Sequence, residues 1–367
     1  MIQIAGGGPA GLTTGINLLD KGFDVLIFDR EGEVGVPQHC SGIVSERFVK
    51  LMNIPQKLIV NKLYGLKVHH ISDEYIIRSS VPKAYIIDRY EYEKWLGRIF
   101  VDKGGIIKFN MEIRNMGRFK NTLVIDARGA PIYINKRRSG FLPAIQYVYK
   151  FDDLDSFNPR LAHIFIARSI NPDFFSWSVN IGGDKWKIGT ASKRNMRKIL
   201  KEYLKYMAGG KVSDVLYGYV ITGGPLKKFR EGNIIAIGDS AGQVKPTTGG
   251  GLLYHAVASK MLSNNIYEGR LDYEKDFYSF LGREIHLQTL ARKIFLELSD
   301  DEFRELVSVL SDKELSNLIL TLGDMDFHVS SVWKIFKDLW KYKPLIRVAG
   351  IGRLMRLLWT YTEFHNQ

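Results

Sequence analysis

Cysteine is nearly absent from this sequence, which has one such residue, Cys40, among 367. A single cysteine excludes an intrachain disulfide framework and is typical of proteins in a reducing compartment. The sequence also lacks internal repeats and low-complexity segments, which argues against a repeat architecture. We therefore expect a globular cytoplasmic protein, and its length is sufficient for two or three domains.

Long apolar runs are missing as well. The best candidate, residues 344–359, is interrupted by Arg347, Arg353 and Arg356, whereas a helix that spans a bilayer needs about 20 predominantly apolar residues. We also find no catalytic triad and no cluster of metal ligands, so no bound metal is predicted.

Acidic residues are few in comparison with basic ones, 39 against 52, which gives a formal net charge of +13. Such an excess fits nucleic acid, an anionic membrane surface or an acidic substrate, and a merely solvated basic surface is the alternative. No nucleic-acid-binding motif is present, so we predict no nucleic acid partner. The membrane surface is the partner that we expect.

The first thirty residues contain a dinucleotide-binding signature. An apolar strand over residues 2–5 leads into the G-x-G-x-x-G pattern of Gly6, Gly8 and Gly11, which opens a helix before a second strand over 25–28. Gly6 permits the tight turn, Gly8 the approach of a pyrophosphate, and Gly11 close packing of helix and strand. Asp29 follows the second strand, where a carboxylate accepts the hydroxyls of an adenosine ribose.

A second glycine-acid turn distinguishes FAD from NAD, which satisfies the first motif equally well. The apolar strand over 233–237 ends in Gly238 and Asp239. A carboxylate at this strand end can accept a hydrogen bond from the ribityl chain, which NAD lacks. The stretch from Thr247 to Gly251 then opens another helix, whose N-terminal dipole suits negative charge on a reduced flavin.

The order of the expected elements predicts an α/β plus α+β fold, in which a Rossmann-like FAD-binding domain is interrupted by an antiparallel-sheet substrate domain. The FAD-binding domain is expected over residues 1–58, 86–141 and 229–270, and the sheet domain over 59–85 and 142–228. Within these ranges we expect helices over 90–103, 194–208 and 251–264, and strands over 106–113 and 122–126. Residues 271–367 are expected to form a helical C-terminal region.

These motifs resemble those of the para-hydroxybenzoate hydroxylase-type flavoproteins and, within them, the archaeal geranylgeranyl reductases. The broader likeness rests on residues 6–29, 88–89, 124–129 and 238–239. The narrower one rests on residues 37–42, which contain Cys40, on residues 248–251, on residues 175–179 with 188–189, and on the tail from Leu298 to Asp301. The family's aromatic box usually reads Tyr-x-Trp-x-Phe-Pro; here Phe175, Trp177 and Val179 occupy it, and only the tryptophan is kept.

The resemblance implies a set of site residues. Cys40 is placed beside the flavin ring, as a candidate catalytic residue, and Arg89 is expected to neutralise the pyrophosphate. Phe175, Trp177 and Val179 are the implied substrate contacts. Together with Gly6, Gly8 and Gly11, the implied FAD contacts are Ala10, Asp29, Arg30, Cys40, Ser41, Ile43, Arg89, Ile113, Asp239, Gly250, Gly251 and Leu252.

The function implied is hydrogenation of C=C bonds in geranylgeranyl chains of membrane lipids or their precursors. The electrons would come from an external donor, either ferredoxin or a reduced nicotinamide. A flavin monooxygenase acting on a small aromatic, a flavoprotein that passes electrons to quinone, and a basic membrane scaffold are the alternatives. Residues 332–342 read as a basic amphipathic helix at a membrane surface, and a helix packed on its own domain, the more common case for such a pattern, is the alternative. We expect peripheral association with the inner face of the membrane.

Overall fold

The computed structural model describes residues 1–328 except 72, 117–118, 120–121, 153–156, 208 and 309–310. The chain divides into two compact units. The first unit comprises residues 1–38, 88–141 and 221–285, and the second comprises 39–87, 142–220 and the chain from 286 onward. The helix expected over 332–342 lies outside the described residues. The division into three parts made from the sequence stays a prediction.

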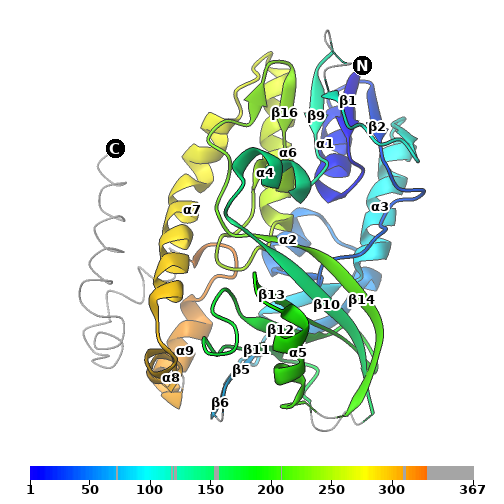
Figure 1. The fold of residues 1–367 in the computed structure, drawn as a ribbon. Coiled ribbons are helices and arrows are strands. Elements are labelled where there is room, and N and C mark those ends of the chain that lie inside the picture. Colours follow the sequence, from blue (N-terminus) through cyan, green and yellow to red (C-terminus); the bar gives the residue numbers. More distant parts are fainter. Residues whose placement is uncertain are drawn as a thin grey trace. The chain divides into compact units, whose positions relative to one another are not determined.

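The first unit is built on a six-stranded sheet in the order β15-β16-β9-β1-β2-β8 (Figure 1). Its four internal pairings, from β16 to β8, are parallel, and only β15 is antiparallel to its neighbour. The strands are β1 (Ile2–Ala5), β2 (Val25–Phe28), β8 (Ile106–Lys108), β9 (Val124–Asp126), β15 (Arg230–Glu231) and β16 (Ile234–Ala236). The apolar runs of β1, β2, β9 and β16 are largely buried, as a parallel sheet covered by helices requires, whereas the edge strands β8 and β15 are largely exposed.

The helices of this unit are α1 (Pro9–Leu19), α3 (Arg89–Asp102), α4 (Ala130–Arg137), α6 (Leu252–Tyr267) and the first part of α7 (Glu274–Glu297). α1 packs against both α3 and α6. Gly15 makes the first contact possible, because a Cβ there would lie 2.6 Å from the Phe100 ring. In the second contact the Thr14 hydroxyl lies 2.9 Å from that of Ser259. α1, which begins directly after the glycine turn, is therefore held by contacts with two neighbouring helices.

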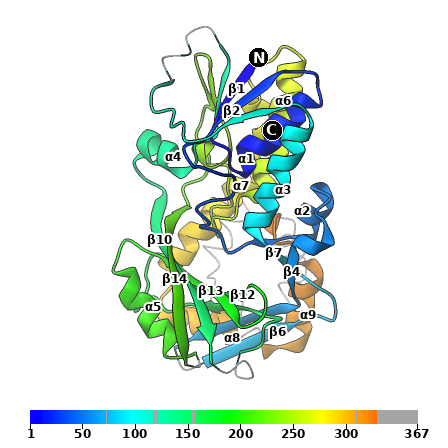
Figure 2. The same ribbon diagram turned by 90° about the vertical axis from the view of Figure 1, so that its right-hand side faces the viewer.

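The second unit contains a seven-stranded sheet in the order β14-β10-β13-β12-β11-β5-β6 (Figure 2). Its strands are β5 (Gly65–His70), β6 (Asp73–Arg78), β10 (Phe141–Phe151), β11 (Ala162–Phe165), β12 (Ser176–Asn180), β13 (Lys185–Ala191) and β14 (Gly210–Ile221). Adjacent strands from β10 to β11 are antiparallel, and β11 pairs with β5 in parallel. A three-stranded sheet, β3-β7-β4, consists of β3 (Ile43–Val44), β4 (Ile59–Leu63) and β7 (Ala84–Ile87).

The two faces of the larger sheet have different roles. α5 (Met196–Leu204) covers one face, where Leu200 and Tyr203 pack with Trp186 and Ile188 of β13. Since side chains alternate along a strand, the intervening Lys187 and Gly189 face the opposite side. The second unit also contains α2 (Glu46–Leu51), α8 (Asp300–Ser308) and α9 (Lys313–Leu322).

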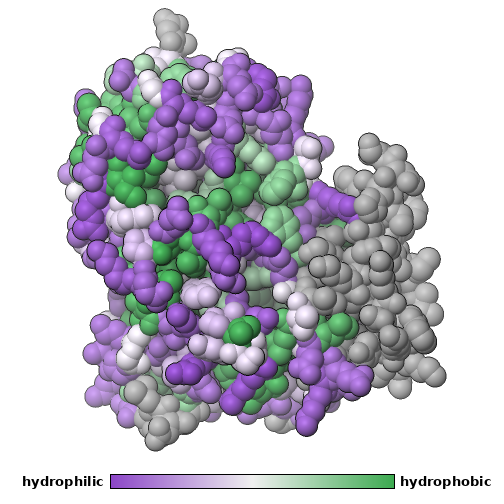
Figure 3. Space-filling model, turned by 180° about the vertical axis from the view of Figure 1, so that it is seen from behind, coloured by the Kyte–Doolittle hydropathy of each residue, from purple (hydrophilic) through white to green (hydrophobic). Residues whose placement is uncertain are grey.

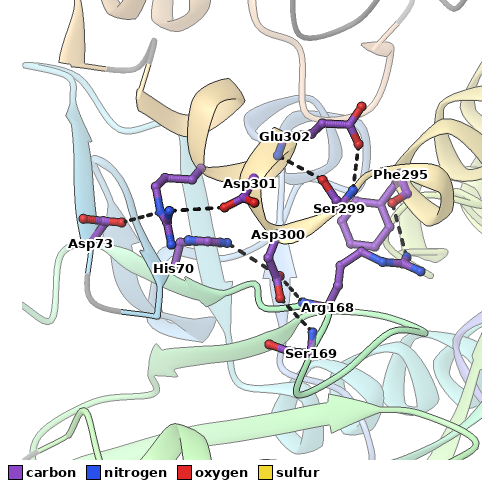
Figure 4. A network of polar contacts seen from close by, with 10 residues as sticks. His70, Asp73, Arg168, Ser169, Phe295, Ser299, Asp300, Asp301 and Glu302 are labelled. Carbon is purple, nitrogen blue, oxygen red and sulfur yellow. Dashed lines mark hydrogen bonds and ion pairs between the residues drawn. The ribbon is translucent and has the colours of Figure 1, made fainter.

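A polar network fixes the start of α8 on this sheet (Figure 4). The Asp300 carboxylate accepts hydrogen bonds from the backbone N–H groups of Arg168, at 2.6 Å, and Ser169, at 3.0 Å. Its Oδ1 also lies 3.6 Å from Nε2 of the fully buried His70. Ser299 and Glu302 form a reciprocal capping box, with side chain-to-backbone bonds of 3.2 and 2.8 Å. The tail motif at residues 298–301 is therefore a helix start anchored to the sheet.

The predicted fold class, α/β with a separate sheet domain and C-terminal helices, is confirmed. Some element bounds differ from the expectation. The strand expected over 106–113 ends at Lys108, because Asn110 adopts a positive φ of 55° and turns the chain. On the face seen in Figure 3, hydrophilic side chains are interspersed with hydrophobic ones. Among the helices that the structure describes, none is long and apolar enough to cross a bilayer.

Candidate functional site

The glycine turn between β1 and α1 contains one position that is open. Gly6 has φ +106°, and a Cβ there would lie 2.4 Å from the carbonyl oxygen of Ala127. A Cβ on Gly11 would lie 2.0 Å from the carbonyl oxygen of Gly6. A Cβ on Gly8, in contrast, would meet no atom within 4 Å. The protein's own packing thus requires Gly6 and Gly11, whereas Gly8 leaves free space at the N-terminus of α1, where a pyrophosphate would bind.

Asp29 stabilises the same turn through a hydrogen bond to its backbone. Its Oδ2 accepts a hydrogen bond of 2.6 Å from the backbone N–H of Gly7, and its Oδ1 accepts one of 2.9 Å from Glu31. Each carboxylate oxygen has two lone pairs, so capacity remains for ribose hydroxyls. Arg30 is more than half exposed and forms an ion pair of 2.7 Å with Glu31. The structure therefore places Asp29, and not the Arg30 side chain, against the turn.

The two glycine-acid turns meet within the first unit. Gly238 has φ +66°, and a Cβ there would lie 2.6 Å from the Cβ of Ala10. Gln243 holds Gly238 in place by accepting its N–H at 2.8 Å and donating to the Tyr273 hydroxyl at 2.9 Å. Segments more than 220 residues apart in the sequence are thus in direct contact.

Asp239 and the start of α6 complete this side of the site. The Asp239 Oδ1 lies 3.1 Å from His255 Nε2 of α6, and its side chain is 37% exposed, so the carboxylate is accessible. Gly251 leaves room for that histidine, since a Cβ on Gly251 would lie 2.4 Å from His255 Nε2. Gly250, Gly251 and Leu252 form the turn that opens α6, as expected from the sequence.

Lys245 is a residue of this turn that the sequence analysis missed. Its side chain is 6% exposed, and its Cε would lie 2.9 Å from a Cβ on Gly250. A buried cation therefore lies beside the glycine turn at the N-terminus of α6. The charge of the lysine and the positive end of the helix dipole both favour a nearby anion. In the sequence, Lys245 is recognisable only as a lysine within an otherwise uncharged loop. The sequence alone does not distinguish a buried lysine from an exposed one.

Two arginines of the first unit are held by acidic partners. Arg89, at the start of α3, is paired with Glu93 and its side chain is 11% exposed. Arg128 binds both oxygens of Asp126, at 2.9 and 2.8 Å, and donates to the carbonyl oxygen of Ile113 at 2.6 Å. The backbone of Ile113 is thus fixed by Arg128, whose role the sequence did not reveal. The role of Arg89 toward a pyrophosphate stays a prediction.

The other predicted site residues lie in the second unit. Cys40 is partly buried in the loop before β3, and the N–H of Gly42 lies 3.4 Å from its sulfur. Ser41 precedes the same strand, and Ile43, within it, pairs with Ile86 of β7. The structure therefore groups Cys40, Ser41 and Ile43 in one unit and the glycine turns in the other.

The expected substrate contacts occupy β12 and the residue before it. The rings of Phe175 and Trp177 meet edge to face, with centroids 6.3 Å apart, and both are partly buried. Val179 is fully buried in a cluster with Leu63 and Ile86. Phe175 and Trp177 therefore retain accessible surface, whereas the side chain of Val179 contacts the protein's own core.

Comparisons with known proteins place these features in context. No protein-family model matches the chain. An uncharacterized protein of Methanocaldococcus jannaschii is 28% identical over 92% of this chain and 95% of its own length. The digeranylgeranylglycerophospholipid reductase 2 of Methanothermobacter thermautotrophicus is 24% identical over 86% of this chain and 93% of its own.

A solved structure shares the fold. It is that of a geranylgeranyl bacteriochlorophyll reductase-like protein of Thermoplasma acidophilum, with a TM-score of 0.79 at 19% identity, covering 95% of this chain and 98% of that one. The predicted resemblance to the geranylgeranyl reductases is therefore confirmed, and the names of these relatives agree with the expected enzyme class, a reductase.

Proposed function

We propose that this protein is an FAD-dependent reductase that hydrogenates C=C bonds in geranylgeranyl chains of membrane lipids or their precursors. The observation that carries the proposal is the likeness, over most of the chain, to proteins named digeranylgeranylglycerophospholipid reductase. The contact between the two glycine-acid turns supports the part of the proposal that concerns FAD, because it brings a pyrophosphate site and an accessible carboxylate into one unit.

The residues present fit FAD. The open space at Gly8 and the N-terminus of α1 suit the pyrophosphate, and Asp29 retains acceptor capacity for ribose hydroxyls. Asp239 is accessible to the ribityl hydroxyls. Lys245 and the N-terminus of α6 provide positive charge for the ring once it is reduced. When bound and reduced, FAD supplies a hydride to one carbon of the double bond.

The protein's task is to hold the alkene and deliver a proton to its other carbon. An isolated double bond has no carbonyl to polarise, so no oxyanion hole is required. Phe175 and Trp177 provide an apolar surface for a prenyl chain. Cys40, or a water molecule beside it, is the proposed source of the proton. An external donor, ferredoxin or a reduced nicotinamide, must restore two electrons after each bond is saturated.

The experiment that tests this function uses the purified protein reduced with dithionite under anaerobic conditions. After addition of a digeranylgeranyl lipid, we expect flavin reoxidation together with stepwise gains of hydrogen pairs in the lipid's mass spectrum. Oxygen incorporation into an aromatic substrate would instead support a monooxygenase. Reoxidation by quinone with no change in lipid mass would support an electron carrier. Either of these two outcomes contradicts the proposal.

We further propose that the protein works at an anionic membrane surface, since its substrate chain is embedded in a bilayer. Support among the described residues comes from α5 and its flanks, where six exposed cations surround one acid, Glu202: Lys193, Arg194, Arg197, Lys198, Lys201 and Lys205. Arg197 donates to the hydroxyl of Tyr217 on β14 at 2.7 Å. Tyr217 and Tyr219 are about half exposed on the same face of that strand. Exposed tyrosines beside cations are typical of surfaces that bind anionic lipid headgroups.

The double substitution Arg197→Glu and Lys201→Glu is expected to weaken binding to phosphatidylglycerol vesicles by at least about thirtyfold, since each cation near such a surface contributes about 1 kcal/mol. Flotation of the protein with vesicles measures this. The double substitution Lys227→Glu and Lys228→Glu makes the same change of charge at two exposed lysines in the other unit. Equal losses in both double variants would show that net charge, and not this face, governs binding.

A further inference from the structure

Three neighbouring strands of the larger sheet present a row of residues beneath the Cys40 loop. Gln146 of β10 and Trp177 of β12 are both paired in register with Gly189 of β13. A Cβ on Gly189 would lie 2.4 Å from the indole of Trp177, so this glycine makes room for the indole to cross the middle strand. The Trp177 Nε1–H then donates to the Gln146 Oε1 at 3.0 Å.

The same face of the sheet holds the loop by two consecutive carbonyl groups. The Nε2 of Gln146 donates to the carbonyl oxygen of His39 at 3.3 Å. The Nζ of Lys187, two residues from Gly189 on β13, donates to the carbonyl oxygen of Cys40 at 2.6 Å. Beneath the loop, Gly218 of β14 lies close to His39, since a Cβ there would be 3.5 Å from that of His39, an ordinary contact distance. The peptide groups on both sides of Cys40 are therefore fixed from below.

Both anchoring residues are buried: Gln146 is 3% exposed and Lys187 is 6% exposed. A lysine at such depth is unfavourable for folding compared with an apolar residue of similar size, unless strong hydrogen bonds compensate for its desolvation. A hydrogen bond from a charged donor to the Cys40 carbonyl is of this strong class.

We propose that Gln146 and Lys187 are positioning residues, which fix the Cys40 thiol and join its loop to Trp177 through Gln146. The role in catalysis rests on the proposed function, in which Cys40 and Trp177 face the prenyl chain. The fixation of the loop does not depend on it. Movement of the indole on binding an apolar chain would be transmitted to the loop through one side chain, that of Gln146.

The single cysteine makes this directly measurable, because alkylation of the native holoprotein by iodoacetamide reports on Cys40 alone. In Lys187→Met, we expect the plateau alkylation rate at high pH to rise about tenfold, as the loop loses a charge-assisted hydrogen bond. Lys187→Arg should restore this rate toward that of the unmodified protein.

Lys185→Met is the matched control, since Lys185 lies on the same strand but is exposed. Gln146→Glu separates the two contacts of Gln146: an acceptor for Trp177 remains, while the donor to His39 is lost. In that variant, amide hydrogen exchange of residues 39–42 should accelerate while that of β12 does not. Gln146→Leu should accelerate the exchange of both segments.

The proposal is overturned if Lys187→Met and Gln146→Leu match Lys185→Met in alkylation rate and amide exchange. If Lys187→Met does not fold, Gln146→Glu still decides the question, because it retains a polar side chain and the proposal requires faster exchange of residues 39–42 in it, with no change in β12. A protein that fails to hydrogenate lipids but shows these changes would lose the proposed function and keep the anchored loop. The two failures are therefore distinguishable.

Discussion

Replacing Gly8 with valine is expected to leave the apoprotein folded while weakening FAD binding by at least about a hundredfold, because the new side chain would occupy the space of the pyrophosphate. Gly8 has φ −76° and ψ −176°, an extended conformation that a β-branched residue adopts without strain. Since a Cβ there meets no protein atom within 4 Å, the fold has no reason to resist the change. Flavin absorbance after saturation with FAD, combined with circular dichroism, measures both effects.

Two further glycines provide the comparison. Gly11→Ala is expected to destabilise the fold itself, since its Cβ would lie 2.0 Å from the carbonyl oxygen of Gly6. Gly282→Ala on α7 is the benign control, because its Cβ would meet only Tyr278, at 3.4 Å. Full flavin occupancy in Gly8→Val would refute the assignment of the pyrophosphate site and, with it, the FAD-dependent function.

The parts of the site that the sequence predicts are those formed by adjacent residues. The turn from Gly6 to Gly11 is set by local conformational requirements, which the residue types reveal directly. α2 and α4 escaped prediction because helices of six and eight residues are too short to show a periodic pattern. α4 is capped by Arg138, the residue after its end, which takes a left-handed conformation without the glycine that usually marks such an end.

The partners of the predicted residues could not be found in this way. Gln146 and Lys187 are 107 and 147 residues from the carbonyl groups they hold. Their proximity depends on the order of strands in the sheet, which hydrophobic alternation within one strand does not determine. The alternation of residues along a strand predicts on which face of its strand each of Gln146 and Lys187 lies. It does not predict that the Cys40 loop covers this face, because that depends on the whole fold. Lys245 was missed because its burial, like that of Gln146 and Lys187, follows from the folded chain and not from the local sequence.

Acidification below about pH 6.5 is expected to destabilise the folded protein through a buried histidine pair. His69 of β5 and His163 of β11 are each 1% exposed, and their Nε2 and Nδ1 atoms lie 3.2 Å apart. Burial, reinforced by the charge of Lys67, lowers the pKa of His69 to about 4. Burial lowers the pKa of His163 to about 3. Both rings are therefore neutral in the folded protein at pH values where an exposed histidine is already protonated.

The sign of the effect follows from proton binding. Between the unfolded pKa of about 6.5 and the folded pKa of about 4, the unfolded chain binds more protons at His69, so the free energy of unfolding decreases as pH falls. The stabilisation is complete above pH 6.5 and is lost progressively toward pH 4. For His69 alone the loss is on the order of 3 kcal/mol, since each pKa unit corresponds to about 1.4 kcal/mol.

Urea unfolding at pH 7.5 and pH 5 measures this difference. The double substitution His69→Leu and His163→Phe removes both bases without leaving one unpaired, and phenylalanine retains the stacking that His163 makes with Phe157 at 3.9 Å. In this variant the free energy of unfolding should depend much less on pH over the same range. His286→Gln replaces an exposed histidine and should leave the dependence unchanged. If the double variant loses as much stability at pH 5 as the unmodified protein, another group carries the acid sensitivity, and the neutral pair on β5 and β11 is not its cause.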